Sequence, residues 1–455
     1  MKKISILIIF MLNHAAYSQS ITITELQNIA LSENPRIKAM ESEAQMTKRK
    51  IPQSDALEDP KLKFGANWLS AKNFSYPKQY ITSRDIDATQ VTIGKGYSEM
   101  IPYAEIGISQ MIPLGKLGYR RKIAVKEYEK AAVKFKAEKV ETLHMLRMNF
   151  YELTYLRSSI KIMEDIKKQI KLVADSEVAA AKSGMGSLSN VIKAKIEHNM
   201  ADEEIIVLKQ KQKEIEQKIN YLTGKKLEVK TDKLPEPDSR PVPSEAVQKE
   251  IMASNPQLKL LALDMEISQS EISLKKAEYT PDMEIGFSYM RNRNGAQQRM
   301  NETMFGAGGM VTPVYKTERM KQDDMVSFMV TFNIPFWFWK KNIPMVDEMK
   351  KKHDAAKSQY RDKLNDLDAR AEILASNLAK WNELYRLYRD KLIPQTELAL
   401  ETNLARYRTS SVEFMPVVDT VRMLLKYKKE LLMAAKEYHA SYSELNALMG
   451  VEVLQ

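Results

Sequence analysis

Apolar residues recur at alternating spacings of four and three along a long stretch of the second half of the chain. These positions are Leu367, Ala371, Leu374, Leu378, Trp381, Tyr385, Tyr388 and Leu392. The heptad spacing predicts a helix of roughly seventy residues, from about 337 to Arg408, that packs on other helices as a coiled coil. Pro394 lies within this helix, so we expect a kink or local unwinding there. The first half repeats the pattern through Leu143, Leu146, Phe150, Leu153, Ile160, Met163 and Ile170.

A second pattern, with a period of two, predicts strands at about 61–70, 103–112, 282–291 and 325–335. Apolar alternates such as Phe64, Ile106 and Phe328 are expected on one face of these strands. The polar alternates, expected on the other face, are Lys61, Lys63, Glu105, Asp282, Glu284 and Asn333. The intervening segments 72–102 and 293–324 are polar and contain glycine, and we expect them to be long loops.

The two halves are copies of one plan. SENPRIKA at residues 32–39 returns as ASNPQLKL at 253–260, and the two Asn-Pro pairs lie 221 residues apart. Asn is a good helix N-cap and Pro is suited to the first helical position, so each phrase starts a helix. The helix ends NYLTG (220–224) and NALMG (446–450) are also paired. We therefore predict repeats at 19–229 and 246–455, joined by a proline-rich connector at 230–245, with helical hairpins that turn at tips 181–190 and 406–416.

The first 18 residues differ from the rest of the chain. Two lysines, an apolar run and the small residues of Ala16-Tyr17-Ser18 are typical of a secretory signal peptide, with a mature start at Gln19. No later apolar stretch approaches the roughly 18–20 residues of a membrane-spanning helix. The chain has no cysteine, so disulfides and thiol chemistry are excluded. The formal net charge of +11 is spread along helices, which indicates solvated faces, and we expect no nucleic-acid partner for an exported chain.

Four alternating strands in an exported chain can span an outer membrane only if several copies share one barrel, because an open edge leaves backbone groups unpaired in hydrocarbon. Two copies would give a barrel filled by side chains, whereas three would give twelve strands and room for water. The polar alternates would then face a wet lumen. An ordinary hairpin pair with one face on a core is the alternative that the pattern leaves open.

The duplicated plan of Asn-Pro helix, strand, long loop, strand ending in Ile-Pro, long helix, polar tip and returning helix resembles the TolC family of outer-membrane efflux proteins. The likeness covers residues 22 to 451, and the tips SGMGSLSNV (183–191) and Tyr407 through Asp419 are similar to the family's turns. The resemblance implies an α+β membrane protein: a homotrimer with a twelve-stranded β-barrel in the outer-membrane lipid and an α-helical tunnel through the periplasm. It also implies two partners, a periplasmic adaptor (membrane fusion protein) and an inner-membrane pump.

The resemblance also implies roles for residues at the tips. Asp419 matches a pore aspartate, and a threefold axis would place three copies in a ring that attracts cations. The other candidates for the periplasmic gate are Tyr407, Arg408, Ser189 and Asn190. The candidates for docking the adaptor are Gly184, Met185, Gly186, Ser187, Ser410 and Ser411. The chain departs from the family where Ser410 replaces a glycine, Pro416 a second pore aspartate, and Asn190 the first tip's aspartate.

We found no nucleophile motif, dinucleotide fingerprint or close histidine spacing, so we expect a passive conduit that is not an enzyme and needs no cofactor or protein-bound metal. The cargo stays open. Ile393-Pro394-Gln395 is similar to the family's heavy-metal resistance branch, and thioethers, of which the 27 methionines supply many, bind soft metal ions. A conduit for type I secretion of polypeptides is a second possibility within the fold. The alternative outside it is an exported coiled-coil structural or adaptor protein.

Overall fold

The computed structural model describes residues 22–67, 78–81, 93–96, 103–182, 187–229, 233–238, 244–292, 296–305, 311–320, 323–409 and 414–451. The predicted signal peptide and the proline-rich connector's masked positions lie outside these ranges. The chain forms two compact units. A helical unit takes residues 1–50, 124–269 and 351–455, and a sheet unit takes residues 51–123 and 270–350. Each unit draws on both predicted repeats, whose exact bounds stay a prediction.

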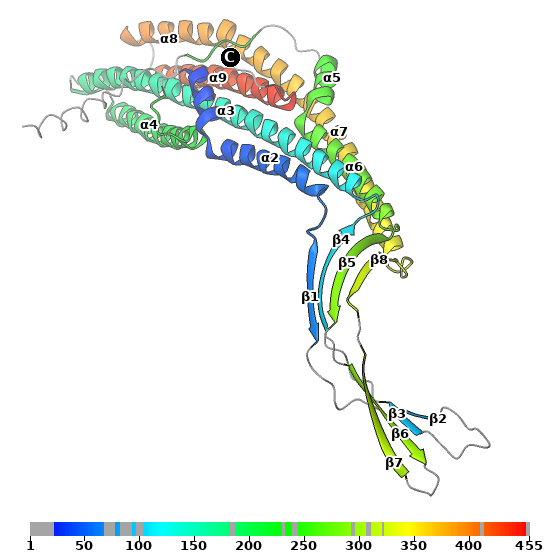
Figure 1. Ribbon diagram of the computed structural model, residues 1–455. Coiled ribbons are helices and arrows are strands. Elements are labelled where there is room, and N and C mark those ends of the chain that lie inside the picture. The colour runs from blue at the N-terminus through cyan, green and yellow to red at the C-terminus, as the bar shows by residue number, and fades with distance from the viewer. Residues whose placement is uncertain are drawn as a thin grey trace, which may run out of the picture. The chain divides into compact units, whose positions relative to one another are not determined.

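Long helices dominate the chain (Figure 1). In chain order the first half contributes α1 (Ile23–Glu33), α2 (Pro35–Ser54), α3 (Leu117–Lys182) and α4 (Leu188–Thr223). The second half contributes α5 (Ser244–Ser254), α6 (Pro256–Ala277), α7 (Asn342–Leu387), α8 (Ile393–Arg408) and α9 (Phe414–Leu448). With 66 residues, α3 is on the order of 100 Å long. The described helices contain no apolar stretch long enough to cross a membrane.

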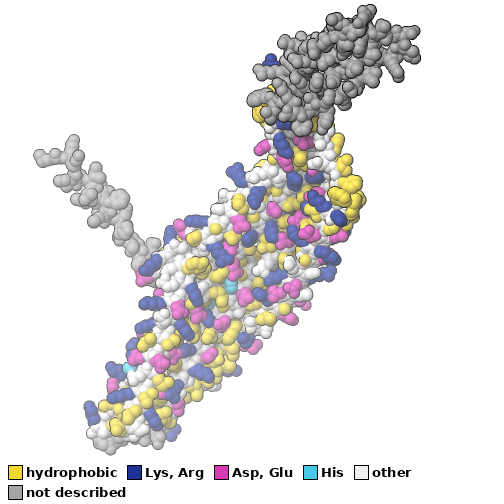
Figure 2. Space-filling model, turned by 90° about the horizontal axis from the view of Figure 1, so that it is seen from below, with side chains coloured by type: hydrophobic (Ala, Val, Ile, Leu, Met, Phe, Trp, Pro, Cys, Tyr) yellow, Lys and Arg dark blue, Asp and Glu magenta, His cyan; other side chains and the backbone are white. Residues whose placement is uncertain are grey.

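The predicted heptad seams form the core of the helical unit. In the second half Leu367, Ala371, Leu374 and Leu378 are all buried and pack with α5, α6 and α9. In the first half Leu146 and Leu153 pack with α1 and α4. Both clusters join a long helix to its neighbours through the predicted seam, which confirms the coiled-coil packing. Over the helices, basic and acidic side chains alternate on the face shown in Figure 2, as expected for solvated helix faces.

A short π-helix at Tyr388–Leu392 joins α7 to α8 directly before Pro394. It confirms the predicted local unwinding, because proline lacks the N–H that the regular helix would use. The extra residue also moves the seam by one position: the buried residues after it are Thr396 and Leu400, where strict continuation of the heptad requires 395 and 399. The apolar seam therefore stays on the buried face of the helix only because the π-helix adds one residue here.

Each repeat is closed by the same four-residue contact, which we call the Asn-Pro clamp. In the first repeat it consists of Asn34, Pro35, Leu222 and Gly224, and in the second of Asn255, Pro256, Leu448 and Gly450. The buried amide of Asn34 donates to the Leu222 carbonyl at 2.8 Å, and that of Asn255 to the Leu448 carbonyl at 2.8 Å.

The same Asn side chains accept from the first turn of the following helix: Arg36 N–H at 2.8 Å in the first repeat and Leu258 N–H at 3.0 Å in the second. The predicted helix starts are thus confirmed. Gly224 and Gly450 have φ of 68° and 67°, and a Cβ on Gly450 would lie 3.0 Å from Pro256 Cδ. Both positions therefore require glycine.

The sheet unit contains one four-stranded antiparallel sheet in the order β1-β4-β5-β8 (Figure 1). Its strands are β1 (Lys61–Asn67), β4 (Tyr103–Ile112), β5 (Asp282–Asn292) and β8 (Met325–Asn333), which confirms the four predicted strands. The loop prediction for 72–102 and 293–324 was wrong in part. Two hairpins lie there: β2 (Lys78–Ile81) with β3 (Ile93–Gly96), and β6 (Ala296–Phe305) with β7 (Val311–Met320). Backbone pairing forms these strands from mixed polar sequences that lack a period of two.

Candidate functional site

The four-stranded sheet has one continuous apolar face. In its register Phe64 lies opposite Ile106, Ile106 opposite Tyr289, and Tyr289 opposite Val326. The next row joins Leu62, Ile108, Phe287 and Phe328 in the same way. These side chains are exposed, Phe64 to 74% and Phe328 to 70%, so no part of the described chain covers them. The predicted facing of the strands is confirmed, and the alternative of a hairpin packed on its own core is wrong.

The opposite face of the sheet carries the predicted polar residues. Lys63 Nζ lies 3.2 Å from the Glu105 carboxylate, and Ser109 donates to Glu284 at 2.7 Å. Gly107 and Gly286 lie between these pairs and add no side chain to this face. The backbone approaches closely there, because a Cβ on Gly107 would lie 3.0 Å from the Cβ of Ser288. The alternation also places Met290 and Met325 on this face, directly opposite each other. One side of the sheet thus suits lipid and the other suits water and charged solutes.

β1 and β8 are the two edges of the sheet within the described residues. An edge strand presents unpaired N–H and C=O groups that can pair with another chain. The sheet of one chain is therefore open on both sides.

The helical tips form the second candidate site. Near the end of α8 the Tyr407 hydroxyl donates to Glu177 Oε1 of α3 at 2.6 Å. The Glu177 side chain is buried, and Tyr407 packs against Ala194 of α4 and Val418 of α9. All four helices therefore meet at Tyr407. Burial, together with the bond to Glu177, raises the pKa of the Tyr407 hydroxyl well above its usual value.

Two ion pairs with the same sequence separation join α4 to α9. Arg422 Nε lies 2.9 Å from Glu197, which it also contacts through Nη2, and Lys429 contacts Glu204. Both pairs span 225 residues and lie seven residues apart on each helix, so the two returning helices run parallel in register. Glu197 is largely buried, with 11% of its side chain exposed.

The structure places the predicted gate residues as follows. Asp419 is exposed on α9, where its carboxylate lies 3.5 Å from Arg422 Nη1, so each predicted ring carboxylate has a cation beside it. Ser189 and Asn190 lie in the first turn of α4. Their backbone N–H groups donate to the Ser187 hydroxyl and carbonyl at 3.2 and 3.0 Å. Arg408 is the last residue of α8.

Ser187, predicted to dock an adaptor, is the exposed N-cap of α4. The remaining predicted docking residues, Gly184, Met185, Gly186, Ser410 and Ser411, lie outside the described residues. The described part of the tip therefore brings Tyr407 together with Glu177, and Glu197 together with Arg422, and sequence reasoning missed these three charged residues. The 225-residue separation of opposite charges, close to the repeat offset, is the one signal that could have indicated them.

Two partly buried histidines lie farther along the helical unit. His144 Nδ1 lies 3.1 Å from the Ser443 hydroxyl, and His439 Nε2 lies 2.9 Å from the Pro235 carbonyl. Burial lowers the pKa of both imidazoles below 6.5. In the part of the chain that the structure describes, His, Asp and Glu do not gather in groups of three that could hold a metal ion.

One family model and several solved structures match the chain. The family model described as outer membrane efflux protein matches residues 26–225 and 247–451. No curated protein sequence matches the chain. Three solved channels share the fold at low identity. The outer-membrane channel OprN has a TM-score of 0.72 at 12% identity, over 94% of this chain and 89% of that one.

The outer membrane protein VceC of Vibrio cholerae has a TM-score of 0.69 at 13% identity, over 94% of this chain and 96% of that one. The outer membrane channel MtrE of Neisseria gonorrhoeae, solved in its open state, has a TM-score of 0.69 at 13% identity, over 94% and 88%. The matches extend through both repeats, so the chain shares the fold of these channels over 94% of its length.

Proposed function

The chain belongs to the outer membrane efflux protein family, and from this premise we propose that it is the outer-membrane channel of a tripartite efflux system. In this proposal three chains form the channel. A periplasmic adaptor and an inner-membrane pump hand over the substrate, which then passes through the channel without catalysis.

The exposed apolar face of the sheet carries the proposal. Its two complete rows hold eight apolar side chains, and the opposite face holds the Lys63–Glu105 ion pair and the Glu284 carboxylate. A soluble coiled-coil protein would not leave such a face in water, so this observation favours the channel over the exported structural or adaptor protein. Three copies would join β1 of one chain to β8 of the next and leave no free edge, giving twelve strands with a wet interior.

The tip supports a gate. Tyr407 and Arg422 tie α8 and α9 to α3 and α4 through buried carboxylates, so these helices can separate only if both contacts break. We propose that Asp419, next to Arg422, faces the pore with its copies from the other two chains. A ring of three carboxylates attracts cations and repels anions.

Planar-bilayer recording tests the proposal. The purified protein is expected to form cation-preferring pores whose conductance rises in Asp419→Ala or Tyr407→Phe. Chemical cross-linking and mass measurement in detergent should show a trimer. Absence of any pore in the parent and in both variants would reject the channel.

From the likeness at Ile393-Pro394-Gln395 we propose a heavy-metal cation as the cargo. The test is to compare the metal resistance of cells with and without the gene. Polypeptide secretion would instead require a pore wide enough for an extended chain. Conductance together with the metal-resistance assay separates the two cargo classes.

A further inference from the structure

Shortly after the end of β8 at Asn333, the chain forms an exposed aromatic cluster made of Phe336, Trp337, Phe338 and Trp339. The rings contact each other edge to face, with centroids 5.3 Å apart for Phe336 and Trp337, 5.5 Å for Trp337 and Trp339, and 5.3 Å for Phe338 and Trp339. Trp337 is 60% and Phe336 66% exposed. The equivalent segment of the first repeat, Pro113-Leu114-Gly115-Lys116, has no aromatic residue. The cluster is thus specific to one repeat.

The cluster continues the apolar face of the sheet. From Val326 to Ile334 the apolar alternates of β8 span eight residue steps, roughly 27 Å along the strand. A strand tilted by about 40° would then cross about 21 Å of membrane, close to the roughly 25 Å apolar band of outer-membrane barrels. The aromatic cluster follows at the end of this band, where Trp side chains prefer to lie between hydrocarbon and headgroups.

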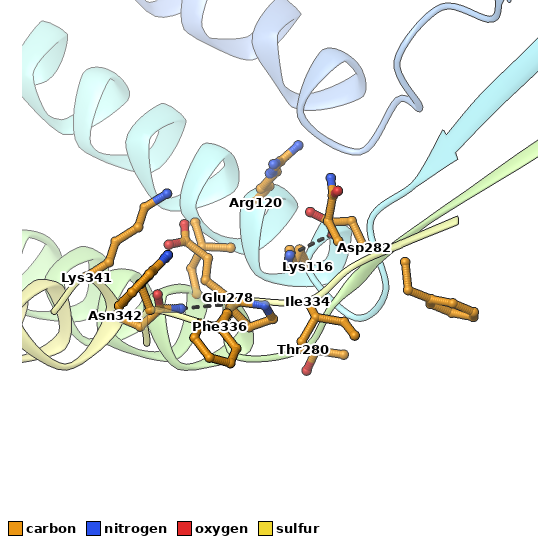
Figure 3. A pocket seen from close by; sticks show the side chains of 14 residues that line it. Lys116, Arg120, Glu278, Thr280, Asp282, Ile334, Phe336, Lys341 and Asn342 are labelled. Atoms are coloured by element: carbon orange, nitrogen blue, oxygen red, sulfur yellow. Dashed lines mark hydrogen bonds and ion pairs between the residues drawn. The ribbon is translucent and has the colours of Figure 1, made fainter. Parts of the chain in front are cut away.

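A pocket of about 660 Å³ lies beside the cluster (Figure 3). It is lined by residues of both basic segments that the sequence contains at this junction, GKLGYRRK (115–122) and WKKN (339–342). In Figure 3 the ends of Arg120 and Lys341 extend to one side of the pocket, while Ile334 and Phe336 lie on the other. The pocket therefore has a charged side and an apolar side.

Most charges of the pocket are already paired. Lys116, with only 7% of its side chain exposed, lies 2.6 Å from Asp282, and Glu278 lies 2.9 Å from Lys275. Arg120 and Lys341 have no carboxylate partner among the residues that the structure describes. Two unpaired cations beside an exposed apolar wall fit a molecule with a phosphate and a hydrocarbon chain.

We propose that the pocket binds an anionic phospholipid at the membrane surface where the strands give way to helices. Arg120 and Lys341 contact the phosphate, since guanidinium and ammonium groups both suit its oxygens. Ile334 and Phe336 contact the first carbons of the acyl chains, and the tryptophans lie at the level of the headgroups. The site fixes how deep the sheet inserts. It rests on the proposed placement of the sheet in a bilayer.

Tryptophan fluorescence tests the site. The chain has four tryptophans, so a Trp68→Phe/Trp381→Phe background leaves Trp337 and Trp339 next to the pocket. The protein is reconstituted in vesicles of phosphatidylcholine and phosphatidylglycerol, with bromine on the chains of one lipid or the other. Brominated phosphatidylglycerol is expected to quench more strongly at equal mole fraction, which gives a relative binding constant above one.

Charge variants identify the residues responsible. Arg120→Gln/Lys341→Gln should lower the preference for phosphatidylglycerol by about fivefold for each lost cation. The matched control, Lys122→Gln/Lys340→Gln, removes the same charge from the same two segments outside the pocket and should keep the preference.

Equal quenching by both lipids in the parent would overturn the proposal, as would equal behaviour of the two double variants. A loss of trimer stability in Arg120→Gln/Lys341→Gln with an unchanged lipid preference would assign the pocket to a second copy of the chain and also overturn it. Conductance of the same vesicles separates this result from the channel itself. A conducting protein without a lipid preference contradicts only the lipid site, and a lipid preference without conductance contradicts only the channel.

Discussion

Replacing Tyr407 by Phe removes one oxygen from the tip and tests whether the bond to Glu177 holds the helices together. The hydroxyl lies 2.6 Å from a carboxylate whose residue is 5% exposed. A hydrogen bond to a charged group contributes about 1.5–3 kcal/mol, and the carboxylate left behind loses a donor that water cannot easily replace. If the bond exists only in the closed tip, its loss shifts the closed-to-open equilibrium by about tenfold to a hundredfold.

Single-channel recording measures this shift as open probability. Tyr442→Phe is the matched control, because Tyr442 lies on α9 and is 45% exposed. Glu177→Gln should have a smaller effect than Tyr407→Phe, since the amide still accepts the bond. A double-mutant cycle of the two changes should return a coupling energy above about 1 kcal/mol.

The pKa of Tyr407 adds a pH signature. Because burial and the bond to Glu177 raise this pKa above 10.0, the closed tip keeps the proton that an open, solvated Tyr would lose. The preference for the closed tip is therefore constant below about pH 10 and declines as the pH rises above it. If Tyr407→Phe and Tyr442→Phe have the same open probability at neutral and at high pH, the bond between Tyr407 and Glu177 does not hold the tip closed.

Three further changes test the sheet, the clamp and the partly buried His144. Phe64→Arg should cost roughly 2–4 kcal/mol near the bilayer midplane and lower the outer-membrane yield, whereas Lys63→Gln on the other face should not; equal yields would contradict the assigned faces. Asn255→Ala should lower the unfolding free energy by about 2–4 kcal/mol through the lost helix cap and the orphaned Leu448 carbonyl. Asn255→Asp keeps the helix cap and should recover part of the lost unfolding free energy, as measured by thermal melts in detergent. Because partial burial lowers the pKa of His144 below 6.5, the unfolded chain takes up this proton first. Acidification below about pH 6.5 should therefore destabilise the parent more than His144→Gln in thermal melts. Melting temperatures that fall equally with pH in both proteins would contradict the lowered pKa of His144.

The parts of the fold that follow from periodicity could be predicted from the sequence. A spacing of 3.5 fixes which side of α7 is buried, and Leu367 through Leu378 lie there. A spacing of two fixes the two faces of the sheet, and Phe64 and Lys63 lie on the expected sides. In both cases the information is local, since each residue's facing depends on its neighbours in sequence.

The contacts at the tip could not be predicted because they depend on how distant helices dock. Glu177 and Tyr407 lie 230 residues apart, and the local sequence around each one does not indicate the other. The Asn-Pro pairs show the same limit. Their role as helix caps is local and was predictable, but the second bond of each Asn to a carbonyl at the far end of the repeat was not. The hairpins β2-β3 and β6-β7 were missed because backbone pairing requires no apolar alternation.

The Asn-Pro clamps also set the order in which the chain can fold. Each joins residues nearly two hundred positions apart, with separations of 188 and 193. Closing so long a loop is slow, because the entropy of the whole segment must be lost before the contact forms. During synthesis the N-terminus emerges from the ribosome first. The chain can then complete the first clamp once Gly224 has emerged, but the second only after Gly450 has emerged. The nascent protein should therefore gain resistance to proteases in two steps, with the first repeat ahead of the second.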